Sequence, residues 1–252
     1  MYGHHVLVTC ALLGACGFEH GAISGDASVG GDDATDAGAG PADFAAATVA
    51  SGAGASSLTY TLLIPAAGTN RFLLVSVQLG TNCPSGVVPS ITGVTYNGVA
   101  LAQVATIVGT PCGTTTTRSD QWQLVDPSPG SHNVVVSLSG TAQSIHSGAM
   151  AFTGINPTIP VRAWKTLAGA GTTASVTIGS APGDIVVNTV GQGNSVTSPG
   201  AGQTERFLKN VDTSNTLNNS GGSTAPGAAM VTMTWTFGSS DEWQSISSSL
   251  RP

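Results

Sequence analysis

The sequence predicts an all-β protein, an antiparallel β-sandwich of jelly-roll type that is preceded by a signal peptide and a disordered tether. From Phe44 onward apolar and polar residues alternate with a period of two, and no stretch shows the 3.6-residue period of an amphipathic helix. The 34 glycines and 13 prolines recur throughout this region as turn signals. The length that follows residue 43, in a chain of 252 residues, suits one large sandwich over 44–252.

The first 15 residues have the organisation of an export signal. The apolar core, residues 6–13, is much shorter than the roughly 20 residues that span a bilayer. Residues 13–16, LGAC, match the lipobox of bacterial lipoprotein precursors, in which the cysteine is acylated after cleavage. Residues 1–5 contain no Lys or Arg, so the expected positive charge comes from the α-amino group and two histidines, or the start lies upstream. We expect Cys16 to carry lipid; the alternative is an ordinary cysteine on an apolar strand.

Residues 16–43 are expected to form a disordered acidic tether. They consist mainly of Gly, Ala, Ser and Asp, with too little apolar surface to offset the entropy of ordering. Six of the thirteen acidic residues lie before Phe44, whereas all seven Lys and Arg residues follow it, so the folded part is neutral. A chain without a basic face is a poor partner for nucleic acid. The lipid would hold it to a membrane in the cell envelope, and Gly17 after the cysteine favours the outer membrane or cell surface.

Two further cysteines agree with export. Cys83 and Cys112 each stand beside a proline in a turn-like context, and in an oxidising compartment two such thiols are expected to form a disulfide. Their spacing matches neither a redox CxxC motif nor a zinc site. The sequence predicts no metal and no cofactor.

The folded part is expected to consist of short strands joined by turns. The clearest local signal is a hairpin over 94–101, because Asn97 and Gly98 suit a type I′ turn, in which both central residues need a positive φ. Residues 231–237 alternate between large apolar residues and threonine, as a half-buried strand does. Polar loops are expected over 191–203 and 210–227. The other predicted strands are 60–64, 73–79, 121–125, 133–138, 144–153, 161–167, 175–178, 185–190 and 242–250.

Several of these motifs together resemble a module found in uncharacterised exported bacterial proteins and lipoproteins. They are the VTYNG hairpin, a tryptophan strand before a Pro-Gly turn, AFTGIN, an APGD turn and a closing SSDEW…LRP. The resemblance covers about residues 44–252. It implies export and a jelly-roll-like fold, and because the motifs are turns and core positions it implies no catalytic residue.

Motifs of common enzyme sites are missing from the sequence. It contains no nucleophile elbow, HExxH, P-loop or dinucleotide fingerprint, and His146 on an apolar strand is expected to be a packed histidine. A polysaccharide-active hydrolase would need two carboxylates on either side of a bond, for which Asp241 and Glu242 with Glu205 are the candidates. We therefore expect a non-catalytic binding or adhesion module with an extracellular polysaccharide as partner. The alternatives are that hydrolase and a purely structural envelope protein.

The candidate ligand-binding residues are two tryptophans and one polar loop. Trp164 and Trp243 stand on weakly patterned strands and are candidate platforms for sugar rings, whereas partial burial at a sheet edge is the alternative. The loop over 210–227 supplies side chains that hydrogen-bond sugars, with a plain connector as the alternative. These loop residues are Asp212, Asn215, Asn218 and Asn219.

Overall fold

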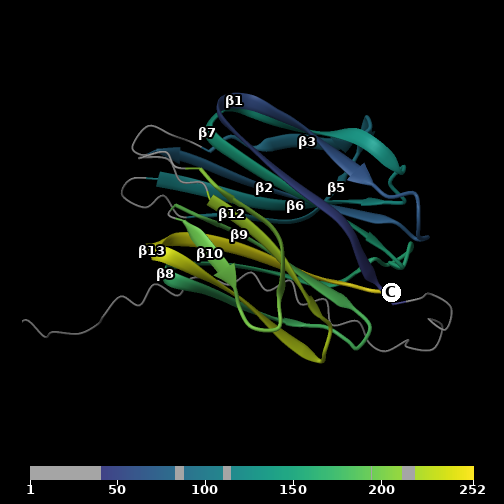
Figure 1. The fold of residues 1–252 in the computed structure, drawn as a ribbon. Coiled ribbons are helices and arrows are strands. Elements are labelled where there is room, and N and C mark those ends of the chain that lie inside the picture. Colours follow the sequence, from purple (N-terminus) through teal and green to yellow (C-terminus); the bar gives the residue numbers. More distant parts are fainter. Residues whose placement is uncertain (1–40, 83–87, 110–114, 194, 212–218) are drawn as a thin grey trace, which may run out of the picture.

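The computed structural model describes residues 41–82, 88–109, 115–193, 195–211 and 219–252. Within these ranges the regular structure is all β, in two antiparallel sheets of seven and six strands that pack against each other (Figure 1). The predicted antiparallel β-sandwich is therefore confirmed. The signal peptide (1–15), Cys16, most of the tether (16–43), Cys83 and Cys112 lie outside the described residues.

The described strands follow one another with short connections. Their bounds are β1 Asp43–Ile64, β2 Phe72–Asn82, β3 Ile91–Tyr96, β4 Val99–Ala100, β5 Ala102–Val108, β6 Thr115–Val125, β7 Gly130–Thr153, β8 Val161–Gly179, β9 Ile185–Gln192, β10 Val196–Pro199, β11 Thr204–Asn210, β12 Asn219–Pro226 and β13 Met230–Leu250.

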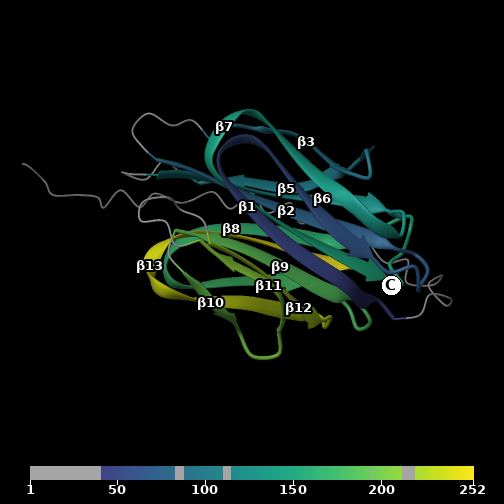
Figure 2. The ribbon, with the colours of Figure 1, turned by 45° about the horizontal axis from the view of Figure 1, so that its top comes forward.

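The first sheet is organised around a long ribbon of β1 and β7, which pair from end to end. The other edge of β7 pairs with β3 along its first part and with β2 along its second part. Near the bulge between Ala55 and Ser57 the ribbon bends, so that an outer layer with β3 and β4 folds over an inner layer with β2, β6 and β5 (Figures 1 and 2). The enclosed core includes Val75, Tyr96 and Val136, all inaccessible to solvent.

The second sheet repeats this connectivity. β8 and β13 form the ribbon, β13 pairs next with β10 and β9, and β12 and β11 continue from β9. Residues 43–153 and 161–250 are therefore two repeats of one sandwich topology, called here the first and the second repeat. The equivalent strands are β1 and β8, β2 and β9, β3 and β10, β5 and β11, β6 and β12, and β7 and β13.

Irregularities of the sheets also fall at equivalent positions, which fixes the residue-by-residue match between the repeats. In the turn that precedes β7, the amide of Asp126 donates to the carbonyl of Arg71 at 2.8 Å, and in the turn that precedes β13 the amide of Gly227 donates to the carbonyl of Asp184 at 2.8 Å. The matching register shifts are Gln103/Ala105 with Glu205/Phe207, and Ile91/Gly93 with Val196/Ser198.

The inner layers of the two repeats pack face to face about an approximate twofold axis. Ser119 Oγ donates to Gln244 Oε1 at 3.0 Å, and their equivalents, Ser220 Oγ and His146 Nδ1, lie 3.4 Å apart. At the margins β1 contacts β11, and the equivalent strands β8 and β5 contact each other. The pairing of residue with equivalent residue resembles the interface of a symmetric dimer, contained here in one chain.

Glycines on β7 and β12 allow the inner layers to approach closely. A Cβ atom on Gly148 or on Gly222 would overlap the ring of Phe207, which fills the space above both. β12 is buried from Asn219 to Ala225 although it is made of small and polar residues. Its composition follows from this contact, since a larger side chain at Gly222 would push the layers apart.

The predicted elements agree with the structure where one face is buried and the other is not. The type I′ turn is confirmed by φ values of 51° at Asn97 and 76° at Gly98, and β13 includes the alternating strand predicted over 231–237. The polar loop predicted over 210–227 is wrong for 219–226, which form the buried strand β12. The loop predicted over 191–203 likewise contains β10.

Candidate functional site

Trp243 does not provide the platform for a sugar ring that the sequence predicts. It is 7% exposed and packs in the core of the second repeat with Trp235 and Val190. Gly169 lies directly against its ring, since a Cβ there would come within 2.6 Å of the indole. The expectation is wrong because the serines that follow Trp243 are also buried, so the polar pattern does not mark a solvent face.

Of the remaining predicted residues, the structure describes Trp164 and Asn219. Trp164 is half-buried on β8, opposite Ser248. Asn219 is buried, and its side chain accepts from the amide of Val211 at 2.8 Å and donates to the carbonyl of Gly193 at 3.3 Å, so it joins two backbone segments. The expectation that Asn219 binds a ligand is therefore wrong. Asp212, Asn215 and Asn218 lie outside the described residues.

The carboxylates considered for hydrolysis lie apart. Asp241 and Glu242 are on β13 and Glu205 is on β11, with β9 and β12 between them. Three strand spacings amount to about 14 Å, whereas the two carboxyl groups of a glycosidase are about 5–9.5 Å apart. The strand pairing therefore gives no support to the predicted grouping of Glu205 with Asp241 and Glu242.

A cleft of about 310 Å³ lies at the turn end of the first repeat. Three connections form it: the turn from β1 to β2, the turn from β6 to β7, and the segment that leads from β7 to the second repeat. Hydrogen bonds between backbones fasten these segments together, from Gly154 to Thr69 at 2.9 Å and from Ile155 to Asn70 at 3.1 Å. The cleft is thus preformed by the fold. Its lining residues are Thr69, Asn70, Arg71, Val125, Asp126 and Pro157.

Arg71 links two of the turns that form the cleft through hydrogen bonds. Its guanidinium donates to the carbonyls of Pro127 and Gly68, both at 3.1 Å, and to Asp126 Oδ1 at 3.2 Å. Asn70 and Asp126 adopt positive φ values of 52° and 48°, a conformation that Asn and Asp tolerate better than most residues. The turn chemistry therefore explains why these two residue types stand at the rim.

The cleft combines hydrogen-bonding groups with small apolar surfaces. The Asp126 side chain is 74% exposed, so its carboxylate is available to a ligand although it also meets Arg71. Val125 and Pro157 are exposed and supply apolar contact beside the hydroxyl of Thr69 and the amide of Asn70. Such a lining suits a hydroxylated ligand. Among the described residues that line the cleft one is a carboxylate, whereas glycoside hydrolysis uses two.

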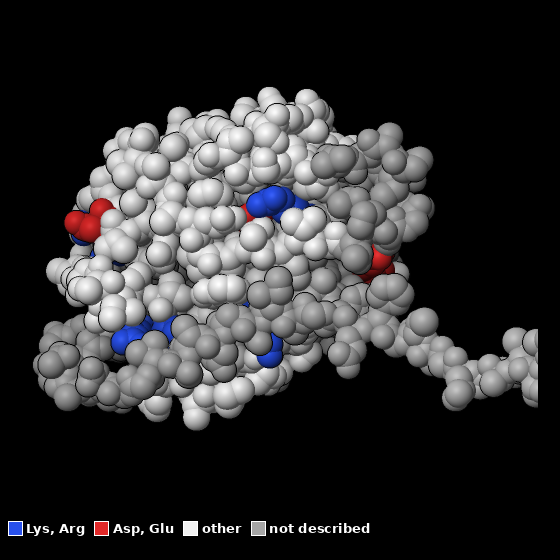
Figure 3. All heavy atoms as spheres, turned by 180° about the vertical axis from the view of Figure 1, so that it is seen from behind, with Lys and Arg blue, Asp and Glu red and all other residues white. Residues whose placement is uncertain are grey.

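Other kinds of site find little support in the described part of the chain. No three His, Cys, Asp or Glu residues there are grouped as metal ligands would be. None of its segments forms a helix suited to crossing a membrane. Where the described residues are visible in Figure 3, the charged side chains stand as small separate groups on an uncharged surface.

The cleft was not predicted from the sequence, because its residues come from three separate turns. In the sequence Asp126 and Asp184 stand out only as turn residues, a setting in which aspartate commonly accepts from backbone amides. Asp184 does so in the structure, where the Ala181 amide donates to its Oδ2 at 3.0 Å. Comparison of the chain with protein-family models, with curated proteins and with solved structures gives no significant match.

Proposed function

We propose that this protein is a lipid-anchored protein of the cell envelope whose β-sandwich domain binds a glycan and does not catalyse a reaction. The observation that carries the proposal is the preformed cleft, whose lining combines the polar Asn70, Arg71 and Asp126 with the apolar Val125 and Pro157. Pyranose rings offer the matching chemistry, since hydroxyl groups pair with amide and carboxylate while C–H faces rest on apolar side chains.

The lipobox supports the anchoring part of the proposal. Cys16 would carry the lipid, and the residues between it and Asp43 would act as a flexible tether. A flexible chain of that length has an end-to-end distance of about 30 Å. The first residue of β1, Asp43, pairs with Thr153. Thr153 in turn lies against Gly68 in the turn from β1 to β2, which helps to form the cleft, since a Cβ on Gly68 would touch Thr153. The tether would therefore join the domain at the end that carries the cleft.

The pairing of β2 with β6 supports a disulfide between Cys83 and Cys112. Asn82 and Thr115 are partners at the open end of these two strands. Cys83 directly follows Asn82, and Cys112 precedes Thr115 by three residues. A bridge in this place would close the end of the β2–β6 pair.

A glycan array tests the proposal on the full-length chain with Cys16→Ala, which leaves the folded domain unchanged. We expect a defined subset of glycans to bind, and binding to fall at least tenfold with Asp126→Gly. Glycine suits the positive φ of Asp126 and removes its carboxylate. Glu205→Ala, which removes an exposed carboxylate from β11, serves as the control and should bind normally. A folded protein that binds no glycan would rule out the glycan-binding part.

Membrane fractionation tests the anchor separately. The unmodified chain should sediment with membranes, and Cys16→Ala should be soluble. Cys10→Ala is the matched control, because Cys10 lies within the expected signal peptide and should not affect attachment. Continued attachment of the Cys16→Ala chain would show that the lipid is not the anchor.

A further inference from the structure

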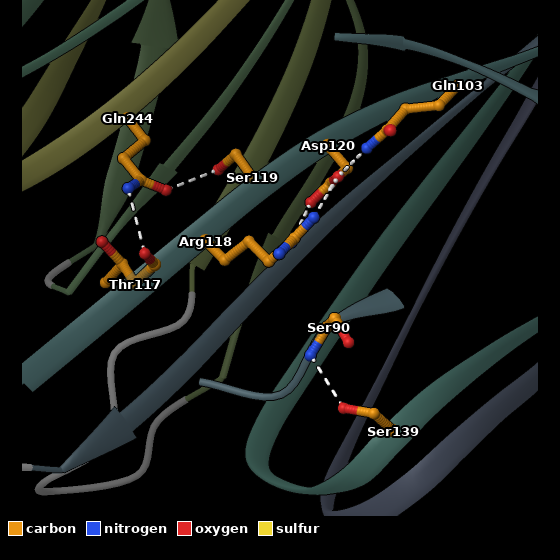
Figure 4. A network of polar contacts seen from close by, with 8 residues as sticks. All are labelled: Ser90, Gln103, Thr117, Arg118, Ser119, Asp120, Ser139 and Gln244. Carbon is orange, nitrogen blue, oxygen red and sulfur yellow. Dashed lines mark hydrogen bonds and ion pairs between the residues drawn. The ribbon is translucent and has the colours of Figure 1, made fainter. Parts of the chain in front are cut away.

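A buried ion pair, formed by residues that do not line the cleft, lies at the β5–β6 edge of the first repeat (Figure 4). Asp120 is inaccessible to solvent, and its carboxylate accepts from Arg118 Nε at 2.6 Å and from Arg118 Nη2 at 3.0 Å. The amide of Gln103, on the neighbouring strand β5, also donates to Oδ1 of Asp120. Asp120 is thus held by one guanidinium and one amide.

The second repeat shows that the fold does not require this pair. The position equivalent to Asp120 is Gly221, because Asp120 pairs with Val77 and Gly221 pairs with the equivalent Val190. The ring of Trp235 fills the space there, since a Cβ on Gly221 would lie 2.6 Å from the indole. One sandwich therefore places a tryptophan where the other places an ion pair.

Stability alone does not explain why the first repeat keeps charged residues in this space. The cost of removing two charges from water commonly equals or exceeds their attraction, and a well-packed apolar replacement is often as stable or more so. Asp120 can instead position the guanidinium of Arg118. A carboxylate on the Nε–Nη2 side leaves the Nη1–Nη2 side of arginine for a second planar anion.

The surroundings of Arg118 are suited to receive such a group. Its side chain is 17% exposed, and no described residue accepts a hydrogen bond from Nη1. Gln103 is exposed at the edge strand β5. Trp122 lies opposite Gln103, shares a face with Asp120 and packs on the core of the first repeat, and its indole N–H is buried without an acceptor among the described residues.

We propose that Arg118, positioned by Asp120, binds the carboxylate of an acidic sugar at the β5–β6 edge. The choice of a sugar rests on the proposed glycan-binding function, whereas the preference for a carboxylate rests on the arginine geometry. The site is separate from the cleft, so each can fail without the other.

Calorimetric titration with hexagalacturonate tests the proposal on the full chain with Cys16→Ala. The folded protein should bind it, and fully methyl-esterified hexagalacturonate should bind at least tenfold more weakly. Free acetate is a third probe, and affinity equal to that of the hexamer would show a carboxylate site without sugar recognition, which overturns the proposal.

Variants locate the binding. Arg118→Gln and Arg118→Lys should each weaken hexagalacturonate binding at least tenfold, because both remove the planar fork, and the lysine variant keeps the charge beside Asp120. Arg162→Gln is the matched control, since Arg162 makes the same kind of pair with buried Asp184 in the second repeat. Glu205→Ala, which lies outside both the cleft and the β5–β6 edge, should bind normally. No binding by the folded parent chain, or equal affinity in Arg118→Lys, would overturn the proposal.

Discussion

Ser119 and Gln244 are joined across the interface by a 3.0 Å hydrogen bond, and the approximate twofold axis relates this contact to the one between Ser220 and His146. The two contacts join equivalent backbone positions, but the second contains a histidine where the first contains a glutamine. Gln244 also donates to the carbonyl of Thr117 at 3.2 Å, so its amide is held at both ends. His146 instead introduces a titratable ring into a buried interface, with consequences for stability.

The stability of the protein should fall between pH 6.5 and about 4 because of His146. Burial, and secondarily the positive charge of Lys209, lowers its pKa from 6.5 to about 4. The unfolded chain then binds a proton that the folded chain excludes, so the free energy of unfolding decreases as the pH falls, by about 3 kcal/mol for this group. Urea denaturation at several pH values measures the effect.

His146→Gln is the matched variant for this effect, since glutamine occupies the equivalent position in the second repeat. Its free energy of unfolding should depend less on pH in this range than that of the parent chain. An unchanged pH dependence would show that other groups, and not His146, cause the loss.

Replacing Gly222 by alanine should destabilise the interface between the repeats. The new Cβ would overlap the ring of Phe207, and overpacking of this kind costs about 1–3 kcal/mol. Gly93→Ala is the control, since a Cβ there meets nothing within 4 Å. Thermal denaturation of both variants provides the measurement, and equal stability would contradict the close packing of Phe207 on Gly222.

The two aspartates of the turns should differ greatly in their contribution to stability. The Asp184 side chain is inaccessible to solvent and accepts from Arg162 at 2.7 Å and from Ser249 at 2.7 Å. Asp184→Ala removes the buried acceptor that these donors share and should cost about 3 kcal/mol. Asp126 pairs with Arg71 at the surface, and Asp126→Gly should cost less than about 1 kcal/mol. Similar losses of unfolding free energy in both variants would refute the distinction.

Reduction should destabilise the chain if Cys83 and Cys112 are bonded. For residues 29 positions apart, an unstrained bridge contributes about 3–4 kcal/mol. Alkylation of the denatured Cys16→Ala protein, followed by mass spectrometry, should modify these cysteines only after reduction. Modification of both without reductant would exclude the bridge.

The sequence reveals those parts of the fold in which local chemistry alone decides the structure. Asn97 and Gly98 predict their turn because few residues adopt positive φ, and the strand around Trp235 is recognisable because one of its faces meets solvent. β12 carries no such pattern, since Gly221 and Gly222 are selected by the neighbouring rings of Trp235 and Phe207.

The repeats and the cleft escape prediction for a related reason. Equivalent positions hold different residues, such as Asp120 and Gly221 or His146 and Gln244, because each repeat fills its own space. Asn70 and Asp126 are far apart in the chain and meet only through the packing of two turns. The sequence identifies both as turn residues, but it does not indicate that they lie close together in space.

Heteronuclear NMR of the Cys16→Ala chain, titrated with cellohexaose, xylohexaose and chitohexaose, tests the central claim most directly, because one sample reports both the binding site and the fate of the sugar. At least one of these glycans should shift the amide signals of Asn70, Arg71 and Asp126, while the signal of buried Trp243 stays in place and no new reducing ends form. Shifts confined to other parts of the domain, or release of shorter sugars, would contradict a non-catalytic binding cleft at this end of the first repeat.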